Sequence, residues 1–167
     1  MPMRLLMTGV VLALVAAAWP AWAWAEFTAK VVTVHEGDQF TIYHDGRRET
    51  IYLKDIDCPE LKQPFGKQAR RVAAAYVGNR DVVIRALKQD RQGRMVAEIL
   101  LVDGRNIAHE LLNEGLAWSR PQSSDGQSLK DMEDLARAAH KGLWADPSPV
   151  PPWKWNTPKN AGRKFSN

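Results

Sequence analysis

The fold is decided by residues 28–56, "TAKVVTVHEGDQFTIYHDGRRETIYLKDI", in which apolar and polar side chains alternate. A period of two is typical of β-strands with one buried face, because successive side chains point to opposite sides of a sheet. Asp45-Gly46 is a strong signal for a hairpin turn between the second and third runs. The stretch therefore predicts a three-stranded meander. Its inward positions include Val32, Val34, Phe40, Ile42, Ile51 and Leu53.

The period changes in "FGKQARRVAAAYVG" (65–78), where apolar side chains recur at helical spacing. Gly78 is placed to end this helix. Two strand-like runs follow at 81–88 and 95–102, and two helical stretches come after them, the first capped by Asn106. The last stretch places on one face Leu129, Met132, Leu135, Ala136 and Ala139.

This order of elements predicts an α+β, mainly β fold, namely a five-stranded OB-fold barrel with three α-helices. A chain of 167 residues has room for one ordinary domain plus tails. We assign residues 26–145 to the domain. Residues 146–167 form a tail rich in Pro, Trp and Lys, which we expect to be extended, with Trp144, Trp153 or Trp155 packing onto the domain.

The first 25 residues are typical of a secretory signal peptide. Arg4 precedes a long apolar run, and Ala23 and Ala25 have the A-x-A spacing of a cleavage site. We expect removal of residues 1–25 and a secreted or periplasmic protein without stable membrane association. The alternative is an uncleaved membrane anchor, since a helix of roughly 20 apolar residues spans a bilayer. The net charge of +4 is compatible with a polyanionic partner.

The stretch "DIDCPE" (55–60) gathers three carboxylates around the only cysteine of the chain. Because like charges repel, these groups either point into water, as a solvated acidic loop, or surround a positive group. In a meander, Asp38 at the end of the first run would lie near them. Oxygen donors without histidine suit Ca²⁺ or Mg²⁺ better than Zn²⁺. A nucleophilic role for the thiol is disfavoured, because reactive thiols need electropositive surroundings.

Six motifs together resemble a known family. They are "EGD" (36–38), "DIDCPE" (55–60), "QPFGKQA" (63–69), "DRQGR" (90–94), "NEGLAW" (113–118) and "KGLW" (141–144). Their order and spacing are similar to those of the staphylococcal-nuclease-like, or thermonuclease, family. The resemblance covers about residues 27–145, and "PVPPW" (149–153) is similar to the tail of many bacterial members. It implies a Ca²⁺-dependent phosphodiesterase built on an OB barrel and acting on DNA or RNA.

The resemblance also implies roles for individual residues. Asp38 and Asp57 would hold one Ca²⁺ ion, with the main-chain carbonyl of Cys58 beside them. Glu60 would position or deprotonate the attacking water. Arg94 would bind the phosphoryl oxygens in bidentate fashion. Asp55 would belong to the strand end outside the site.

The chain departs from the family pattern at the phosphate-binding and base-binding positions. Tyr52 stands where the family usually has a second arginine, although it can itself donate one hydrogen bond. Lys54, on the same strand face, is the better candidate to supply the missing charge. Gln92 replaces the usual Tyr of the "DRQGR" motif. The polar stretch "SRPQSSDG" (119–126) stands where the family often has aromatic residues that stack on a base.

Two hypotheses of different classes therefore stay open. The first is an exported, monomeric, Ca²⁺-dependent endonuclease of the thermonuclease type, with full or reduced activity. The second is a catalytically inactive OB-fold module that binds nucleic acid or another polyanion. A periplasmic interaction protein unrelated to nucleic acid is a third class, with little positive support in the sequence.

Overall fold

The structure, a computed structural model, describes residues 26–120 and 126–155. The predicted signal peptide (1–25) and the end of the tail lie outside the described residues. Five strands close into a barrel in the order β1-β2-β3-β6-β5, which confirms the predicted five-stranded OB-type architecture. The barrel strands are β1 (Phe27–Val34), β2 (Gln39–His44), β3 (Arg47–Leu53), β5 (Asp81–Gln89) and β6 (Met95–Leu100).

The barrel is closed by one parallel pairing between β3 and β6, while the other neighbours are antiparallel. The predicted hairpin is confirmed, since β2 pairs with β3 and His44 lies opposite Arg47. Asp45 and Gly46 both have positive φ, 48° and 77°, as a two-residue turn of this twist requires. Turn chemistry thus fixes the register of β2 against β3.

One inward position of the meander differs from the prediction. The pairing of β1 with β2 shifts between Val31 and Thr33, which marks a β-bulge. Because of this irregularity the buried positions of β1 are Ala29, Val31 and Val34, whereas Val32 is only partly buried. The bulge breaks the simple alternation that the sequence suggested.

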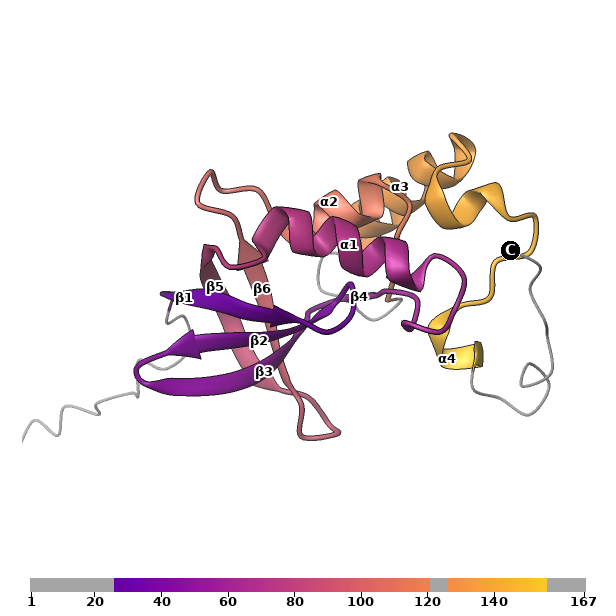
Figure 1. Cartoon of the computed structure of the whole chain (residues 1–167). Coiled ribbons are helices and arrows are strands. Elements are labelled where there is room, and N and C mark those ends of the chain that lie inside the picture. Colours follow the sequence, from indigo (N-terminus) through magenta and orange to yellow (C-terminus); the bar gives the residue numbers. More distant parts are fainter. Residues whose placement is uncertain (1–25, 121–125, 156–167) are drawn as a thin grey trace, which may run out of the picture.

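Three longer helices cover one side of the barrel (Figure 1), as predicted in number and order. They are α1 (Gly66–Val77), α2 (Ile107–Asn113) and α3 (Gly126–Ala138). Gly78 is the C-cap of α1, and the Asn106 side chain caps α2 by accepting a hydrogen bond from the Ala108 N–H at 2.9 Å. The barrel and these helices share one core, which includes Phe40, Ile51, Ile84, Ile99 and Leu111.

The predicted apolar face of α3 is partly wrong. Leu129 and Ala136 are buried, but Leu135 is 71% exposed. Glu133 is buried instead and accepts hydrogen bonds from both the N–H (2.8 Å) and the hydroxyl (2.7 Å) of Ser119. The buried side of α3 therefore includes Glu133 and its hydrogen bonds with Ser119, which hydrophobic periodicity does not reveal.

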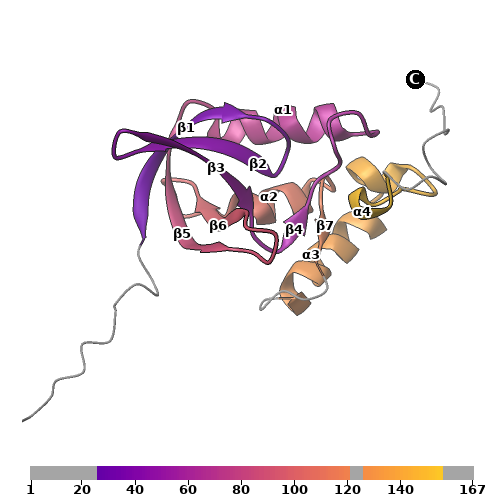
Figure 2. The same ribbon diagram turned by 90° about the horizontal axis from the view of Figure 1, so that it is seen from below.

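Three short elements and one 3₁₀ turn were not predicted. Strands β4 (Ile56–Asp57) and β7 (Trp118–Ser119) pair antiparallel, and they lie side by side in Figure 2. The 3₁₀ helix η1 (Gly142–Ala145) follows α3, and the tail, expected to be extended, contains the one-turn helix α4 (Pro152–Trp155). Within residues 26–120 and 126–155, the helices are too short or too polar to cross a bilayer.

Candidate active site

The loop between β1 and β2 places Asp38 beside the segment that follows β3. The Asp38 carbonyl accepts a hydrogen bond from the Leu53 N–H at 2.9 Å, and its Oδ2 accepts one from the Cys58 N–H at 2.8 Å. Gly37 permits this approach, because a Cβ there would lie 2.8 Å from the Sγ of Cys58. The expected proximity of the two acidic segments is confirmed.

The thiol of Cys58 points into the protein core. The residue is 4% exposed and belongs to the main hydrophobic cluster. Burial, followed by the nearby carboxylates of Asp38 and Asp57, raises the pKa of the thiol well above its usual value. The thiol therefore stays protonated at neutral pH, and Cys58 can face the site with its main chain alone.

The surroundings of the Asp38 carboxyl group disfavour its charged form. Burial raises its pKa to about 7, the hydrogen bond from the Cys58 N–H opposes this change, and the charges of Asp57 and Glu36 add to it. A cation placed between Asp38 and Asp57 would relieve both the desolvation and the repulsion. The two carboxylates are hard oxygen donors of the kind that suits Ca²⁺ or Mg²⁺.

The side chains alone do not complete a coordination shell. Across the described residues, no three side chains of the His, Cys, Asp and Glu types are grouped so that they could hold one metal ion. Calcium takes six to eight oxygen ligands, many of them carbonyls and waters. A cation held by Asp38 and Asp57 would therefore need further ligands from main-chain carbonyls, water or a bound anion.

Glu60 lies in a tight turn between β4 and α1, at the edge of the same cleft. Its N–H donates to the Oε1 of Gln63 at 3.2 Å, and its carbonyl accepts from the Gln63 N–H at 2.8 Å. Glycine is required at position 66, because a Cβ there would lie 1.9 Å from the Glu60 carbonyl oxygen. The N–H and the carbonyl of Glu60 are thus both held in place, which fixes the backbone of this candidate general base.

The turn between β5 and β6 presents Arg94 to the cleft. The carboxylate of Asp90 accepts hydrogen bonds from the N–H groups of Gln92 and Arg94, both at 2.9 Å, and from the Nε of Arg94 at 2.7 Å. Gly93 has a φ of 77°, which favours glycine at this position. Gln92 is exposed at the rim of the cleft.

Tyr52 supports Arg94 directly. The Arg94 guanidinium lies over the Tyr52 ring, 5.0 Å from its centroid, at the range of a cation–π contact. The Tyr52 hydroxyl accepts a hydrogen bond from the Nε2 of Gln39 at 2.8 Å, across the β2–β3 pair. Tyr52 therefore acts through Arg94 in this arrangement, which makes it a positioning residue.

Lys54 lines the cleft but is engaged by acidic neighbours. Its Nζ lies 3.1 Å from a carboxylate oxygen of Glu98 and 3.2 Å from one of Asp55. Asp55, expected outside the site, therefore also belongs to the cleft wall. With two carboxylates beside it, Lys54 is a weak replacement for a missing phosphate-binding arginine.

Arg120 was not predicted as a site residue. It follows β7, and its N–H donates to the Asp55 carbonyl at 2.8 Å. The Arg120 guanidinium forms a salt bridge and hydrogen bond with the carboxylate of Asp57. Partial burial lowers the pKa of Arg120, but the bond to Asp57 outweighs this and leaves the pKa raised. Arg120 thus adds a guanidinium beside Asp57, in the cleft that Arg91 and Arg94 also line.

Asp57, Glu60, Arg94 and Arg120 line one open cleft with a volume of about 700 Å³, whereas Asp38, Cys58 and Tyr52 are not among its lining residues. Its lining includes both carboxylates and guanidinium groups, which together can hold a cation and an anionic phosphate group. The lining residues are Lys54, Asp55, Asp57, Glu60, Lys88, Gln89, Asp90, Arg91, Gln92, Arg94, Val96, Arg120, Pro152 and Trp153.

Residues 50–146 match the family model described as "Staphylococcal nuclease homologue". The chain belongs to the staphylococcal nuclease family. An "Uncharacterized endonuclease" of Escherichia coli O157:H7 is 32% identical over 137 residues, covering 82% of this chain and 89% of the relative. A "Micrococcal nuclease" of Shigella flexneri is 33% identical over 151 residues, covering 83% and 86%. "Protein ParB" of Escherichia coli is 32% identical over 170 residues, covering 95% and 94%.

The expectation that Tyr52 replaces an arginine of the staphylococcal nuclease family stays a prediction. The structure places Arg120 and Trp153 in the same cleft, and neither was predicted as a site residue. The expected packing of a tail tryptophan onto the domain is confirmed by the contact of Trp153 with Trp118. Arg120 follows a strand of two residues, which is too short to give a periodic signal. Trp153 lies in a proline-rich tail, where only the concentration of aromatic residues hinted at a docked segment.

Proposed function

We propose that the chain is an exported, Ca²⁺-dependent nuclease of the thermonuclease type that hydrolyses phosphodiester bonds in DNA or RNA. The supporting observation is the common cleft, where Asp57 and Glu60 lie with Arg94 and Arg120, and Asp38 adjoins through its contact with Cys58. Family membership supports a phosphodiester hydrolase in general terms, and two of the relatives named above are called nucleases.

In this proposal Asp38 and Asp57 hold the cation, with the Cys58 carbonyl as a further oxygen ligand. When bound, Ca²⁺ supplies charge neutralisation and Lewis acidity at the phosphate. Arg94, held by Asp90 and Tyr52, binds the phosphoryl oxygens and stabilises the additional charge of the transition state. Arg120 serves as the second guanidinium that β3 does not supply.

Glu60 is the general base of the proposed reaction. It takes a proton from water as the water oxygen forms a bond to phosphorus. The bond from phosphorus to the leaving oxygen then breaks, and that oxygen is protonated from solvent. The products are one strand end with a phosphate and one with a hydroxyl group. We further propose that the mature enzyme acts as a monomer without stable membrane association.

A second candidate is an inactive OB-fold module that binds nucleic acid or another polyanion. The observations in its favour are Tyr52 in place of a family arginine and the engagement of Asp57 by Arg120. Loss of one transition-state contact costs on the order of 100-fold in rate. Reduced activity is therefore an intermediate outcome between the two candidates.

The test is to incubate the protein with single-stranded DNA, double-stranded DNA and RNA, in Ca²⁺ or in chelator, beside a Glu60→Gln variant. The proposal expects cleavage in Ca²⁺ that is lost in chelator and strongly reduced in the variant. Cleavage that survives both changes would contradict the mechanism. Binding of all substrates without cleavage would support the second candidate. N-terminal sequencing of the exported protein tests removal of residues 1–25.

A further inference from the structure

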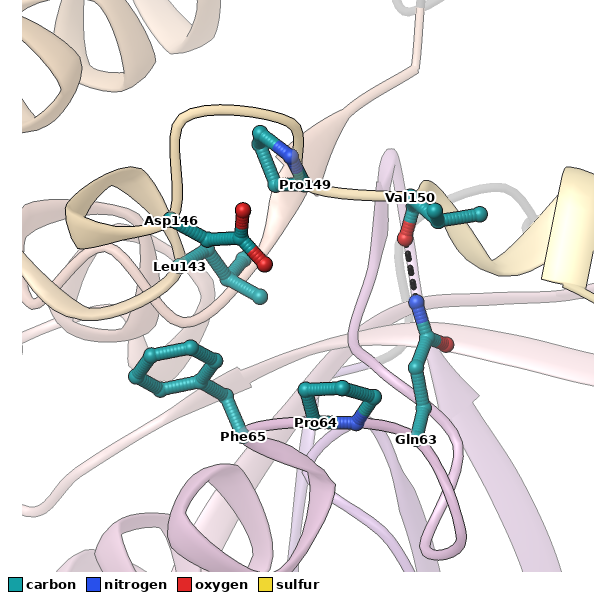
Figure 3. A pocket seen from close by; sticks show the side chains of 7 residues that line it. All are labelled: Gln63, Pro64, Phe65, Leu143, Asp146, Pro149 and Val150. Atoms are coloured by element: carbon teal, nitrogen blue, oxygen red, sulfur yellow. Dashed lines mark hydrogen bonds between the residues drawn. The ribbon is translucent and has the colours of Figure 1, made fainter. Parts of the chain in front are cut away.

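The tail is docked against the loop that precedes α1 (Figure 3). Gln63, which is 5% exposed, donates a hydrogen bond from its side-chain amide to the Val150 carbonyl. Pro64 and Phe65 face Leu143, Asp146 and Pro149 across a small pocket. These contacts join the chain beyond η1 to the segment that carries Glu60.

Docking directs α4 toward the cleft. Pro151 and Pro152 restrict the backbone at the start of this turn, and the Lys154 N–H donates to the Pro151 carbonyl at 2.9 Å. The Trp153 ring then meets Trp118 edge to face, with centroids 6.4 Å apart and planes at 72°. Trp118 is 5% exposed and lies opposite Asp57 in the β4–β7 pair. The contact of Trp153 with Trp118, and the pairing of Trp118 with Asp57, therefore fix the position of Trp153 relative to Asp57.

Trp153 is nevertheless 51% exposed and lines the cleft together with the charged groups. An indole ring buries its apolar area favourably when it can, so a half-exposed ring that is held in place is suited to receive a flat apolar partner. Within a phosphodiester substrate, the groups of that description are the nucleobases. Base–aromatic stacking contributes roughly 1–3 kcal/mol per base and tolerates any base sequence.

We propose that Trp153 stacks on a nucleobase next to the phosphate held by Arg94 and Arg120. This inference rests on the proposed function and adds a base-binding position to it. The tail thereby supplies an aromatic surface that the polar residues after Ser119 do not. Since bases inside a duplex are already stacked, Trp153 favours single-stranded DNA or RNA, or frayed ends, over intact duplex.

The test measures binding of two labelled oligonucleotides of equal length, one with ordinary bases and one with abasic sites throughout. The full chain carries Glu60→Gln so that the strands stay intact, and Trp153→Ala is compared with this background. Tyr43→Ala is the matched control, because Tyr43 is an aromatic residue on β2, 46% exposed and outside the cleft lining. Thermal unfolding checks that each variant is folded.

We expect Trp153→Ala to weaken binding of the ordinary strand about 5- to 150-fold, the equivalent of the stacking energy. Binding of the abasic strand should stay within about twofold, Trp153→Phe should fall between the two, and Tyr43→Ala should change neither. Equal losses of affinity for both strands, or no loss for either, would overturn the stacking role of Trp153. Neither result would contradict the proposed nuclease function. If the parent protein neither binds nor cuts nucleic acid, both proposals fail together.

Discussion

The two walls of the cleft have different origins. One group of lining residues, called here the barrel wall, comes from the barrel and the chain that leaves β3, with Arg94 in the β5–β6 turn, Asp57 on β4 beside the barrel and Glu60 after it. The other group, called the later wall, comes from segments that follow the barrel, with Arg120 and Trp153. The barrel wall has Asp57, Glu60 and Arg94, to which the resemblance gives roles, while the chain departs at Tyr52 and Gln92 from the pattern that the resemblance implies. The later wall adds the Arg120 guanidinium beside Asp57 and the aromatic ring of Trp153. If β3 has lost a phosphate-binding arginine, as the resemblance implies, Arg120 borders the same cleft and is placed to replace it.

We expect the largest loss of catalytic efficiency from a substitution on the barrel wall. Arg94→Ala is expected to lower kcat/KM on the order of 100- to 1,000-fold, because it removes a preorganised donor for the transition state. Steady-state cleavage of a labelled oligonucleotide measures this change. Arg85→Ala is the control, since Arg85 pairs with Glu26 and does not line the cleft. A loss of less than tenfold for Arg94→Ala would show that this wall does not dominate the chemistry.

The later wall should carry a smaller but clear effect. Arg120→Ala is expected to lower kcat about 10- to 100-fold, with Arg120→Lys intermediate because an ammonium cannot bind two phosphoryl oxygens as a fork. Arg120→Ala should also need less Ca²⁺ for half-maximal activity, since Asp57 loses its cationic partner. Ca²⁺ titrations of the cleavage rate separate the two effects. A rise in kcat would mean that Arg120 blocks the cation site and does not assist catalysis.

The difference between the walls also explains what could be predicted from sequence. The Asp45-Gly46 turn, the Asn106 cap and the Gly93 turn are local, and each carries its own signal. The proximity of Asp38 to Asp57 followed from the meander alone. Arg120 and Trp153 depend on the β4–β7 pair and on docking of the tail at Gln63. Such long-range contacts leave no periodic pattern, and the buried Glu133 on α3 was missed for the same reason.

The acidic end of the barrel wall makes a prediction about pH. The pKa of Asp38 is raised by burial to about 7 in the folded protein, from a usual value of 3.8. The folded state therefore binds more protons than the unfolded state between these values, and stability falls as pH rises through this range. Asp38→Asn keeps an acceptor for the Cys58 N–H and removes the charge.

We expect Asp38→Asn to raise the free energy of unfolding at pH 8 by on the order of 1–4 kcal/mol, with little change at pH 4. Urea unfolding at both pH values measures the difference. Added Ca²⁺ should raise the Tm of the parent protein at pH 8 and leave that of the variant nearly unchanged. A variant that is less stable than the parent at pH 8 would show that Asp38 is not strained by its surroundings.

We expect the smallest change in cleavage kinetics from substitutions of Tyr52, whose ring contacts Arg94. Tyr52→Leu removes the ring under the Arg94 guanidinium, and a cation–π contact of about 0.5–2 kcal/mol corresponds to a 2- to 30-fold rise in KM with a smaller change in kcat. Tyr52→Phe keeps the ring, loses only the hydrogen bond from Gln39 and should stay within about fivefold, because such a bond contributes about 1 kcal/mol or less. Cleavage rates across substrate concentrations measure both.

Tyr52→Arg is the sharpest version of this prediction. If Arg120 has taken over the second guanidinium role, an arginine at position 52 adds nothing that the cleft lacks. It also replaces an attractive contact with Arg94 by a repulsive one, because the ring centroid and the guanidinium lie only 5.0 Å apart. Activity should then stay level or fall. A tenfold or greater rise would mean that β3 still needs the family's arginine, and that the rebuilding of this function from the later wall is incomplete.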